Sequence, residues 1–160
     1  MELLIRNMNE KYAQEIICWQ YEEPYDFYNN ELSEESLREF LDNPYFAIMN
    51  EQEELIGFYC TGSAAQVPIG HDFNAYSEEY IDIGIGMKPT LTGKGFGTKF
   101  FSFIIKNIQQ EYATPLRLTV AQFNKRAIFL YEKLGFVKEL EFSTPTEFLT
   151  MLKNCKSDPF

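Results

Sequence analysis

Residues 80–97 read Y-I-D-I-G-I-G-M-K-P-T-L-T-G-K-G-F-G, and the expected fold is built outward from them. Apolar side chains alternate with small or polar ones over 80–87, a period of two that predicts a strand. A proline follows, and glycines then crowd the loop 92–97. Apolar residues recur at helical spacing over 97–112. The stretch therefore predicts a strand, a glycine loop and a helix in direct succession.

Glycines between a strand and a helix are typical of an anion site. The first turn of a helix leaves backbone N–H groups without partners, and its dipole adds partial positive charge. Glycines let the chain curl so that several N–H groups face one anion, usually a phosphate. Lys94 lies inside the loop, with Lys88 and Lys99 near it, in a chain whose net charge is -10. We expect the loop to bind phosphate.

Two common phosphate loops have other spacings. A Walker A loop places Ser or Thr directly after its lysine, but Gly95 follows Lys94 here, so the magnesium-binding hydroxyl is missing. A dinucleotide loop reads G-x-G-x-x-G, whereas residues 93–97 read G-x-G-x-G. The pattern disfavours both classes. A plain flexible turn before a helix is the remaining alternative.

The rest of the chain predicts a single domain over 1–160. Further strands are expected at 3–6, 45–49, 55–60, 116–121, 136–142 and 147–152. Helices are expected at 10–20, after Ser33, and between a cap at Asn124 and a stop at Gly135. The long polar stretch 61–79 is read as a substrate loop or a surface excursion. The predicted fold class is α/β (α+β), with a mixed, mostly antiparallel central sheet flanked by helices.

Composition narrows the class of protein. With 45% hydrophobic residues, the chain is expected to fold into a globule. The charge of -10 disfavours nucleic acid and anionic membrane as partners, and it suits an amine substrate. The three cysteines, Cys18, Cys60 and Cys155, form no motif. No apolar run is long enough for a signal peptide or a membrane helix, so we expect a cytoplasmic protein.

Two segments together resemble the GNAT superfamily of acyl-CoA N-acyltransferases. The family's phosphate loop reads Gln/Arg-x-x-Gly-x-Gly/Ala, and this sequence supplies Thr92, Gly95 and Gly97. The later family helix reads Asn-x-x-Ala-x-x-x-Tyr-x-x-x-Gly-Phe. The matching residues are Asn124, Ala127, Tyr131, Gly135 and Phe136. The segments lie within 80–136. Thr92 departs from the family's longer polar side chain, but backbone N–H groups are expected to carry most of the binding.

This resemblance implies an N-acetyltransferase. Such an enzyme moves an acetyl group from acetyl-CoA to a primary amine by direct attack within a ternary complex. Acetyl-CoA would be a co-substrate, no metal is implied, and the acceptor is an unidentified small molecule or protein. Family members are often monomers or homodimers. The alternative is a non-catalytic acyl-CoA-binding or sensor domain that kept the cofactor cleft.

The resemblance also implies roles for individual residues. Tyr131 would donate a proton to the departing thiolate, and Asp82, on the sparse face of its strand, would be the general base, with Glu79 second. Their alternatives are a packed tyrosine and a solvated or structural carboxylate. The bare glycines Gly84 and Gly86 are compatible with close approach of the pantetheine arm. The cofactor-binding residues implied are Ile85, Met87, Thr92, Gly93, Lys94, Gly95, Phe96, Gly97, Thr98, Asn124, Arg126 and Tyr131.

Overall fold

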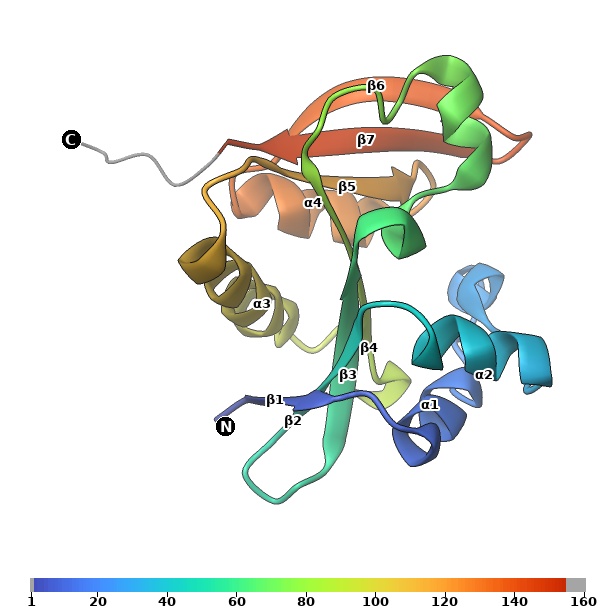
Figure 1. Cartoon of the computed structure of the whole chain (residues 1–160), viewed down its shortest axis with the longest axis vertical. Coiled ribbons are helices and arrows are strands. Elements are labelled where there is room, and N and C mark those ends of the chain that lie inside the picture. The colour runs from blue at the N-terminus through green and yellow to red at the C-terminus, as the bar shows by residue number, and fades with distance from the viewer. Residues whose placement is uncertain (1, 155–160) are drawn as a thin grey trace. The chain divides into compact units, whose positions relative to one another are not determined.

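The computed structural model describes residues 2–154, which fold into two compact units (Figure 1). The first unit comprises the described residues up to Cys60 together with Ile85–Phe100. The second comprises Thr61–Gly84 and the described residues from Phe101 onward. The single domain expected over 1–160 stays a prediction.

Most secondary-structure elements lie at the positions that the sequence predicts. The strands are β1 (Leu4–Asn7), β2 (Tyr45–Met49), β3 (Leu55–Thr61), β4 (Ile81–Met87), β5 (Leu116–Ala121), β6 (Val137–Ser143) and β7 (Glu147–Lys153). The helices are α1 (Glu10–Ile17), α2 (Glu34–Leu41), α3 (Gly97–Glu111) and α4 (Lys125–Lys133). Short 3-10 turns are η1 (Tyr25–Tyr28), η2 (Gly62–Ala65), η3 (Pro68–Phe73) and η4 (Pro89–Leu91).

Within residues 2–154 the strands form one seven-stranded sheet in the order β1-β2-β3-β4-β5-β7-β6. The pairs β1–β2, β2–β3, β5–β7 and β6–β7 are antiparallel, whereas β4 and β5 are parallel. The parallel pair is in register at Ile81–Leu116 and at Asp82–Arg117. The prediction of a mixed, mostly antiparallel sheet is confirmed.

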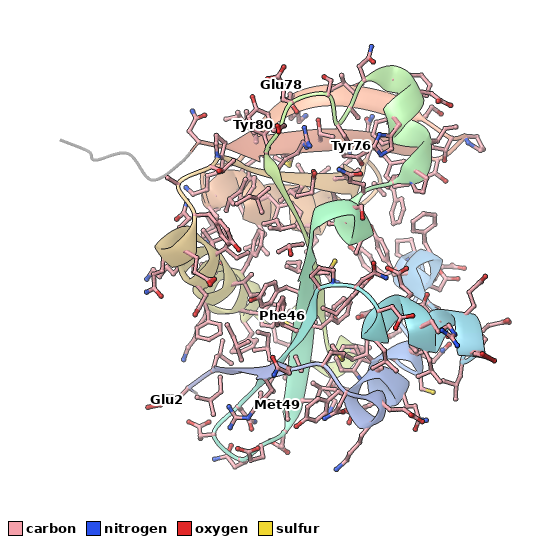
Figure 2. The ribbon with its side chains drawn as sticks, viewed as in Figure 1. Glu2, Phe46, Met49, Tyr76, Glu78 and Tyr80 are labelled. Carbon is pink, nitrogen blue, oxygen red and sulfur yellow. The ribbon has the colours of Figure 1, made fainter. Side chains whose placement is uncertain are left out.

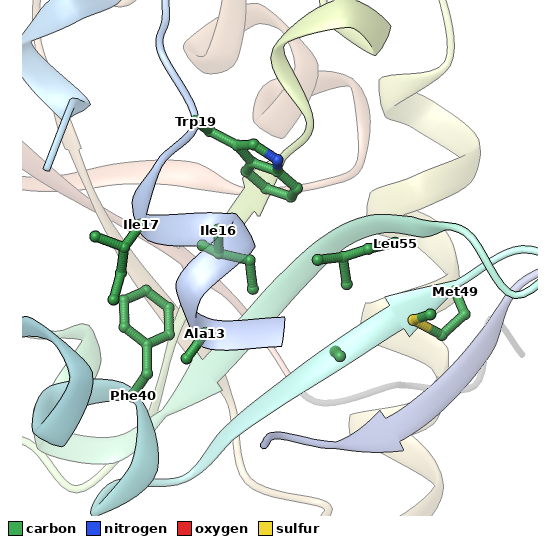
Figure 3. Close-up of a cluster of buried hydrophobic side chains, with 8 residues drawn as sticks. Ala13, Ile16, Ile17, Trp19, Phe40, Met49 and Leu55 are labelled. Carbon is green, nitrogen blue, oxygen red and sulfur yellow. The ribbon is translucent and has the colours of Figure 1, made fainter. Parts of the chain in front are cut away.

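The first unit packs α1 and α2 over the β2–β3 hairpin. Asn9 caps α1 by accepting a bond from the Tyr12 N–H, and Ser33 caps α2 through a reciprocal pair with Ser36. The helices bury one apolar stripe each against the strands, which forms a single core (Figure 3). The buried members of this core are Ala13, Ile16, Ile17, Trp19, Phe40, Ala47, Met49 and Leu55.

Helix α1 is shorter than predicted. The periodicity favours a helix to residue 20, but α1 ends at Ile17 with Cys18 as its cap. The Trp19 N–H bonds to the Ile16 carbonyl, a tighter closing turn of the kind common at helix ends. Trp19 still reaches the core, which is why its apolar spacing resembles a longer helix.

The second unit is built on the β5–β7–β6 strands. Phe142 and Phe148 stack across β6 and β7 and pack with Ala75 and Ala121. Gly135, the predicted helix stop, has a φ of 98°, a left-handed conformation that favours glycine. The long stretch after β3 is not featureless, since it contains η2 and η3.

Three expectations concern the chain as a whole. Cys18 is exposed and Cys60 is buried, while Cys155 lies outside the described residues. Between residues 2 and 154, no helix is both long and apolar enough to span a bilayer. In the same range, His, Cys, Asp and Glu side chains form no group of three or more that is suited to hold a metal ion.

Candidate functional site

The end of β4 presents its backbone at the edge that faces away from β3. The Lys88 N–H donates to the Ile56 carbonyl of β3 at 2.8 Å. Since successive residues of a strand direct their N–H and C=O groups to opposite edges, those of Met87 and Ile85 point away from β3. This orientation suits the backbone contacts that the sequence predicts for these two residues.

The glycine loop follows with two residues in left-handed conformations. The φ angles are 71° at Gly93 and 80° at Gly95, which residues other than glycine adopt only at a cost. A Cβ added at Gly95 would meet no heavy atom within 4 Å, so the backbone there is open to an approaching group. Lys94 between them is exposed, and α3 begins at Gly97. Exposed backbone and a lysine at the start of a helix are the features that a phosphate site needs, and phosphate binding here stays a prediction.

Thr92, the departure from the family pattern, takes a structural role in the loop. Its hydroxyl donates to the Pro89 carbonyl at 2.7 Å, and its own N–H bonds to the same oxygen at 3.2 Å. Thr92 therefore closes the η4 turn through its side chain. An anion at this loop would therefore be held by backbone N–H groups and Lys94.

The first turn of α3 is held against β3 by aromatic packing. A Cβ at Gly57 would lie 2.4 Å from Cζ of Phe100, so the Phe100 ring occupies the place of a side chain there. Phe100 is 1% exposed, and its ring also neighbours that of Phe96 at 6.3 Å. This packing gives the helix N-terminus a defined position, which a preorganised anion site needs.

The bare face predicted around Gly86 is filled by protein. A Cβ at Gly86 would lie 2.2 Å from Cε1 of Phe58, whose ring therefore covers this glycine. The expectation that Gly86 admits a ligand on that face is wrong. The glycine is required because an aromatic ring of the first unit's core approaches the strand closely.

Asp82 does not project from an open face. It is 3% exposed, and its Oδ1 accepts from Nε of Arg117 at 2.7 Å. Its Oδ2 accepts from Nη2 of Arg117 and from Nε2 of Gln66, both at 2.9 Å. The sparse face of β4 is therefore covered at Asp82, and the geometry favours the structural role of this carboxylate over that of a general base.

Arg117 lies between two tyrosine rings. Its Cζ lies 5.0 Å from the ring centroid of Tyr76 and 5.2 Å from that of Tyr80, both labelled in Figure 2. Burial alone would lower the pKa of Arg117, but the hydrogen bond and the charge of Asp82 raise the pKa above its ordinary value. The guanidinium is thus held permanently charged within an aromatic sandwich.

The same cluster fastens the long stretch after β3. The Tyr76 hydroxyl lies 2.7 Å from Oγ1 of Thr119 and accepts a bond from the Val67 N–H at 2.9 Å. His71 Nε2 lies 2.9 Å from Oε1 of Gln66, whose amide also bonds Asp82. These bonds hold the stretch 61–79 in a defined conformation, and both interpretations of it, a substrate loop and a surface excursion, stay predictions.

Helix α4 supplies the remaining predicted residues. Asn124 is the N-cap, and its Oδ1 accepts from the Ala127 N–H at 3.1 Å, which confirms the capping role. Arg126 is exposed at the start of this helix. The Tyr131 ring packs edge-to-face on Phe101 at 5.1 Å and contacts Phe136, so the tyrosine is anchored by the core.

Two residues of this region were not predicted to be important from the sequence. Arg117 was expected only as part of the strand 116–121, although a charged residue amid apolar neighbours is itself a sign of a buried partner. Tyr21 follows α1 and reaches β4, as described below. An open hollow of about 820 Å³ along α2, lined by residues between Asn29 and Asn43, includes none of the predicted site residues.

Comparison with known proteins agrees with this picture. Residues 10–136 match the model of the Acetyltransferase (GNAT) family. The spermidine N(1)-acetyltransferase of Vibrio cholerae is 30% identical over 143 residues, which cover 84% of this chain and 72% of that protein. The mycothiol acetyltransferase of Renibacterium salmoninarum is 30% identical over 94 residues. That match covers 59% of this chain and only 26% of the longer relative.

Solved structures show the same fold. A chimera of the Vibrio cholerae spermidine N-acetyltransferase superposes with a TM-score of 0.68, at 20% identity and 96% coverage of both chains. At that identity the likeness speaks for the fold alone. The family match, which extends over most of the chain, identifies this protein as a member of the GNAT acetyltransferase family.

Proposed function

We propose that this chain is an N-acetyltransferase that moves the acetyl group of acetyl-CoA to a primary amine. The observation that carries the proposal is the loop with left-handed Gly93 and Gly95 directly before the long helix α3. Membership of the GNAT family and the names of the relatives support the same activity.

We assign the binding roles residue by residue. The backbone N–H groups of the loop, with Lys94, would hold the pyrophosphate of the cofactor. The backbone of Ile85 and the N–H of Met87 would bond the amides of its arm, since the Met87 carbonyl already accepts a bond from Tyr21. Asn124 and Arg126 of α4 are proposed as further contacts to the arm and the phosphates. The remaining proposed cofactor-binding residues are Thr92, Phe96, Gly97, Thr98 and Tyr131.

The proposed chemistry needs an acid and a neutral amine. Acetyl-CoA supplies a thioester, whose sulfur leaves as a thiolate. Tyr131 is proposed to give its phenolic proton to that sulfur, because its ring is fixed by Phe101 while a phenol of this kind is a suitable acid. Attack by the amine itself would proceed directly, since holding both reactants together supplies much of the acceleration.

Asp82, the first candidate for the general base, already accepts hydrogen bonds from Arg117 and Gln66. We infer that Asp82 holds Arg117 in place. Removal of the ammonium proton is then assigned to water or to the exposed carboxylate of Glu79.

The acceptor proposed is a small cationic amine, and spermidine is the first to test. One relative is a spermidine N(1)-acetyltransferase. In addition, Glu22, Glu23, Asp26 and Glu31 are exposed beside Phe27 and Tyr28. Carboxylates and aromatic faces both attract ammonium groups.

The cellular setting is part of the proposal. We propose a cytoplasmic monomer or homodimer whose partners are acetyl-CoA and the amine, without nucleic acid or membrane. The net charge of -10 supports the exclusion of nucleic acid and anionic membrane, because their extended arrays of negative charge would be repelled.

The test is an amine panel with acetyl-CoA and detection of the released thiol. The panel holds spermidine, spermine, putrescine, an aminoglycoside and a lysine-containing peptide. Thiol release with at least one amine, together with acetylated product by mass spectrometry, is the expected result. Tight binding of acetyl-CoA without release by any amine would instead indicate a sensor domain. Absence of acetyl-CoA binding in calorimetry would contradict the loop assignment itself.

A further inference from the structure

Tyr21 links two distant parts of the first unit. It follows α1 and precedes η1, and its hydroxyl donates to the carbonyl of Met87, the last residue of β4, at 2.8 Å. The two residues are 66 positions apart in the chain. Its ring packs against the core shared by α1, α2 and the β2–β3 hairpin.

The acceptor of this bond is a functionally placed group. The Met87 carbonyl lies at the edge of β4 that faces away from β3, because the neighbouring Lys88 N–H is bonded to Ile56 of β3. After β4, only Lys88 and the η4 turn precede the glycine loop. Tyr21 is thus attached to the strand end from which the proposed cofactor site begins.

Tyr21 also holds the segment that follows it. Its backbone N–H donates to Oδ1 of Asn29 at 2.7 Å, and the Asn29 side chain returns a bond to Oε1 of Gln20 at 3.2 Å. A further bond joins the Asn29 N–H to the Asp26 carbonyl. Residues 21–31, which we name the acidic aromatic segment, therefore form a loop closed on Tyr21.

The composition of this segment fits a cation. Its four carboxylates, at Glu22, Glu23, Asp26 and Glu31, are all exposed. Phe27 is 49% exposed, and its ring meets that of Tyr28 edge-on at 5.1 Å. Exposed aromatic rings among carboxylates provide both attractions that an ammonium group requires.

We propose that Tyr21 is a positioning residue that ties the acidic aromatic segment to the end of β4 and so places a polyamine acceptor. This rests on the acetyl transfer proposed above. Burial raises the pKa of Tyr21 to about 12, so its hydroxyl remains a hydrogen-bond donor throughout the pH range of an assay. The hydrogen bond from Tyr21 to Met87 therefore acts by holding the segment in place and not by proton transfer.

The closing experiment compares Tyr21→Phe with the wild-type full-length chain, using spermidine and acetyl-CoA. Removal of one hydrogen bond while the ring stays packed should raise the KM for spermidine about three- to tenfold. The kcat and the Kd of acetyl-CoA in calorimetry should change less than about twofold, since Tyr21 itself touches neither reacting group.

Tyr45→Phe is the matched control. Tyr45 packs on the same core, and the substitution likewise removes a hydroxyl that donates to a side chain, Oε2 of Glu39, at 2.9 Å. It should leave the KM for spermidine unchanged. Asn29→Ala is a second probe, because it opens the closed segment without touching the core, and it should raise the same KM.

The outcomes separate the two proposals. An unchanged KM in Tyr21→Phe, or an equal rise in Tyr45→Phe, would overturn the positioning role while leaving acetyl transfer intact. If the wild-type protein transfers no acetyl group to any amine of the panel, the proposed function fails, and the role of Tyr21 fails with it.

Discussion

Arg117 donates hydrogen bonds to both carboxylate oxygens of Asp82. The two residues lie opposite each other on the parallel strands β4 and β5. Both residues are at most 3% exposed. Such a pair is costly to break from one side, because the remaining charge is left buried without a partner. Asp82 is therefore expected to contribute to the stability of the fold and not to catalysis.

Replacement of Asp82 by Asn should lower the free energy of unfolding by about 3 kcal/mol, since it leaves the Arg117 charge uncompensated. Urea unfolding measures this loss. The double variant Asp82→Leu with Arg117→Met should recover most of it, because neither charge then remains. The opposite pattern, full stability with kcat reduced about a hundredfold or more, would restore Asp82 as the general base.

Gly95→Glu should abolish measurable binding of acetyl-CoA, because it places a carboxylate in the anion loop and strains a left-handed residue. Isothermal calorimetry is the measurement. Gly62→Glu is the control, since Gly62 has a φ of 79° and equally open space around a Cβ but lies outside the loop. Comparable affinity in the two variants would remove the loop from the binding site.

Tyr131→Phe should reduce kcat by about a hundredfold while the Kd of acetyl-CoA stays within about twofold, because a phenolic acid is lost and the ring still packs on Phe101. Tyr112→Phe makes the same chemical change at a tyrosine that is 54% exposed, and it should have no effect. Steady-state kinetics with an acceptor from the panel test both. Equal turnover of wild type and Tyr131→Phe would exclude Tyr131 as the acid.

Gly86→Ala should destabilise the protein by about 1–3 kcal/mol, because the new methyl group collides with the Phe58 ring. In the background of Phe58→Leu the same change should cost less, since the smaller side chain leaves room. A double-mutant cycle by urea unfolding gives the coupling between the two sites. Strict additivity, within about 0.3 kcal/mol, would mean that the ring does not limit this position.

Much of the local structure follows from the order of residues. The strand 116–121 has the predicted bounds, and the caps at Ser33 and Asn124 begin helices as their residue types indicate. The glycine loop could be predicted from the sequence because a left-handed backbone strongly favours glycine, whatever the rest of the fold. Alternation along β4 likewise predicted a strand.

The same alternation led to a wrong prediction where the glycines of β4 were taken as a sign of empty space beside the strand. A period of two reveals which side chains share a face, but it does not reveal what covers that face. Phe58 comes from the neighbouring strand to cover Gly86, and Arg117 comes from β5 to meet Asp82. Both partners depend on the register between strands, which no local pattern specifies.

The glycine loop and its place before a helix were therefore decided by short-range chemistry along the chain. The burial of Asp82, the tie from Tyr21 to Met87 and the ring over Gly86 were decided by the tertiary structure. The physical reason is separation along the chain. The features of the glycine loop depend on residues close together in sequence. The three long-range contacts join residues 28 to 66 positions apart, which only the folded structure brings close together.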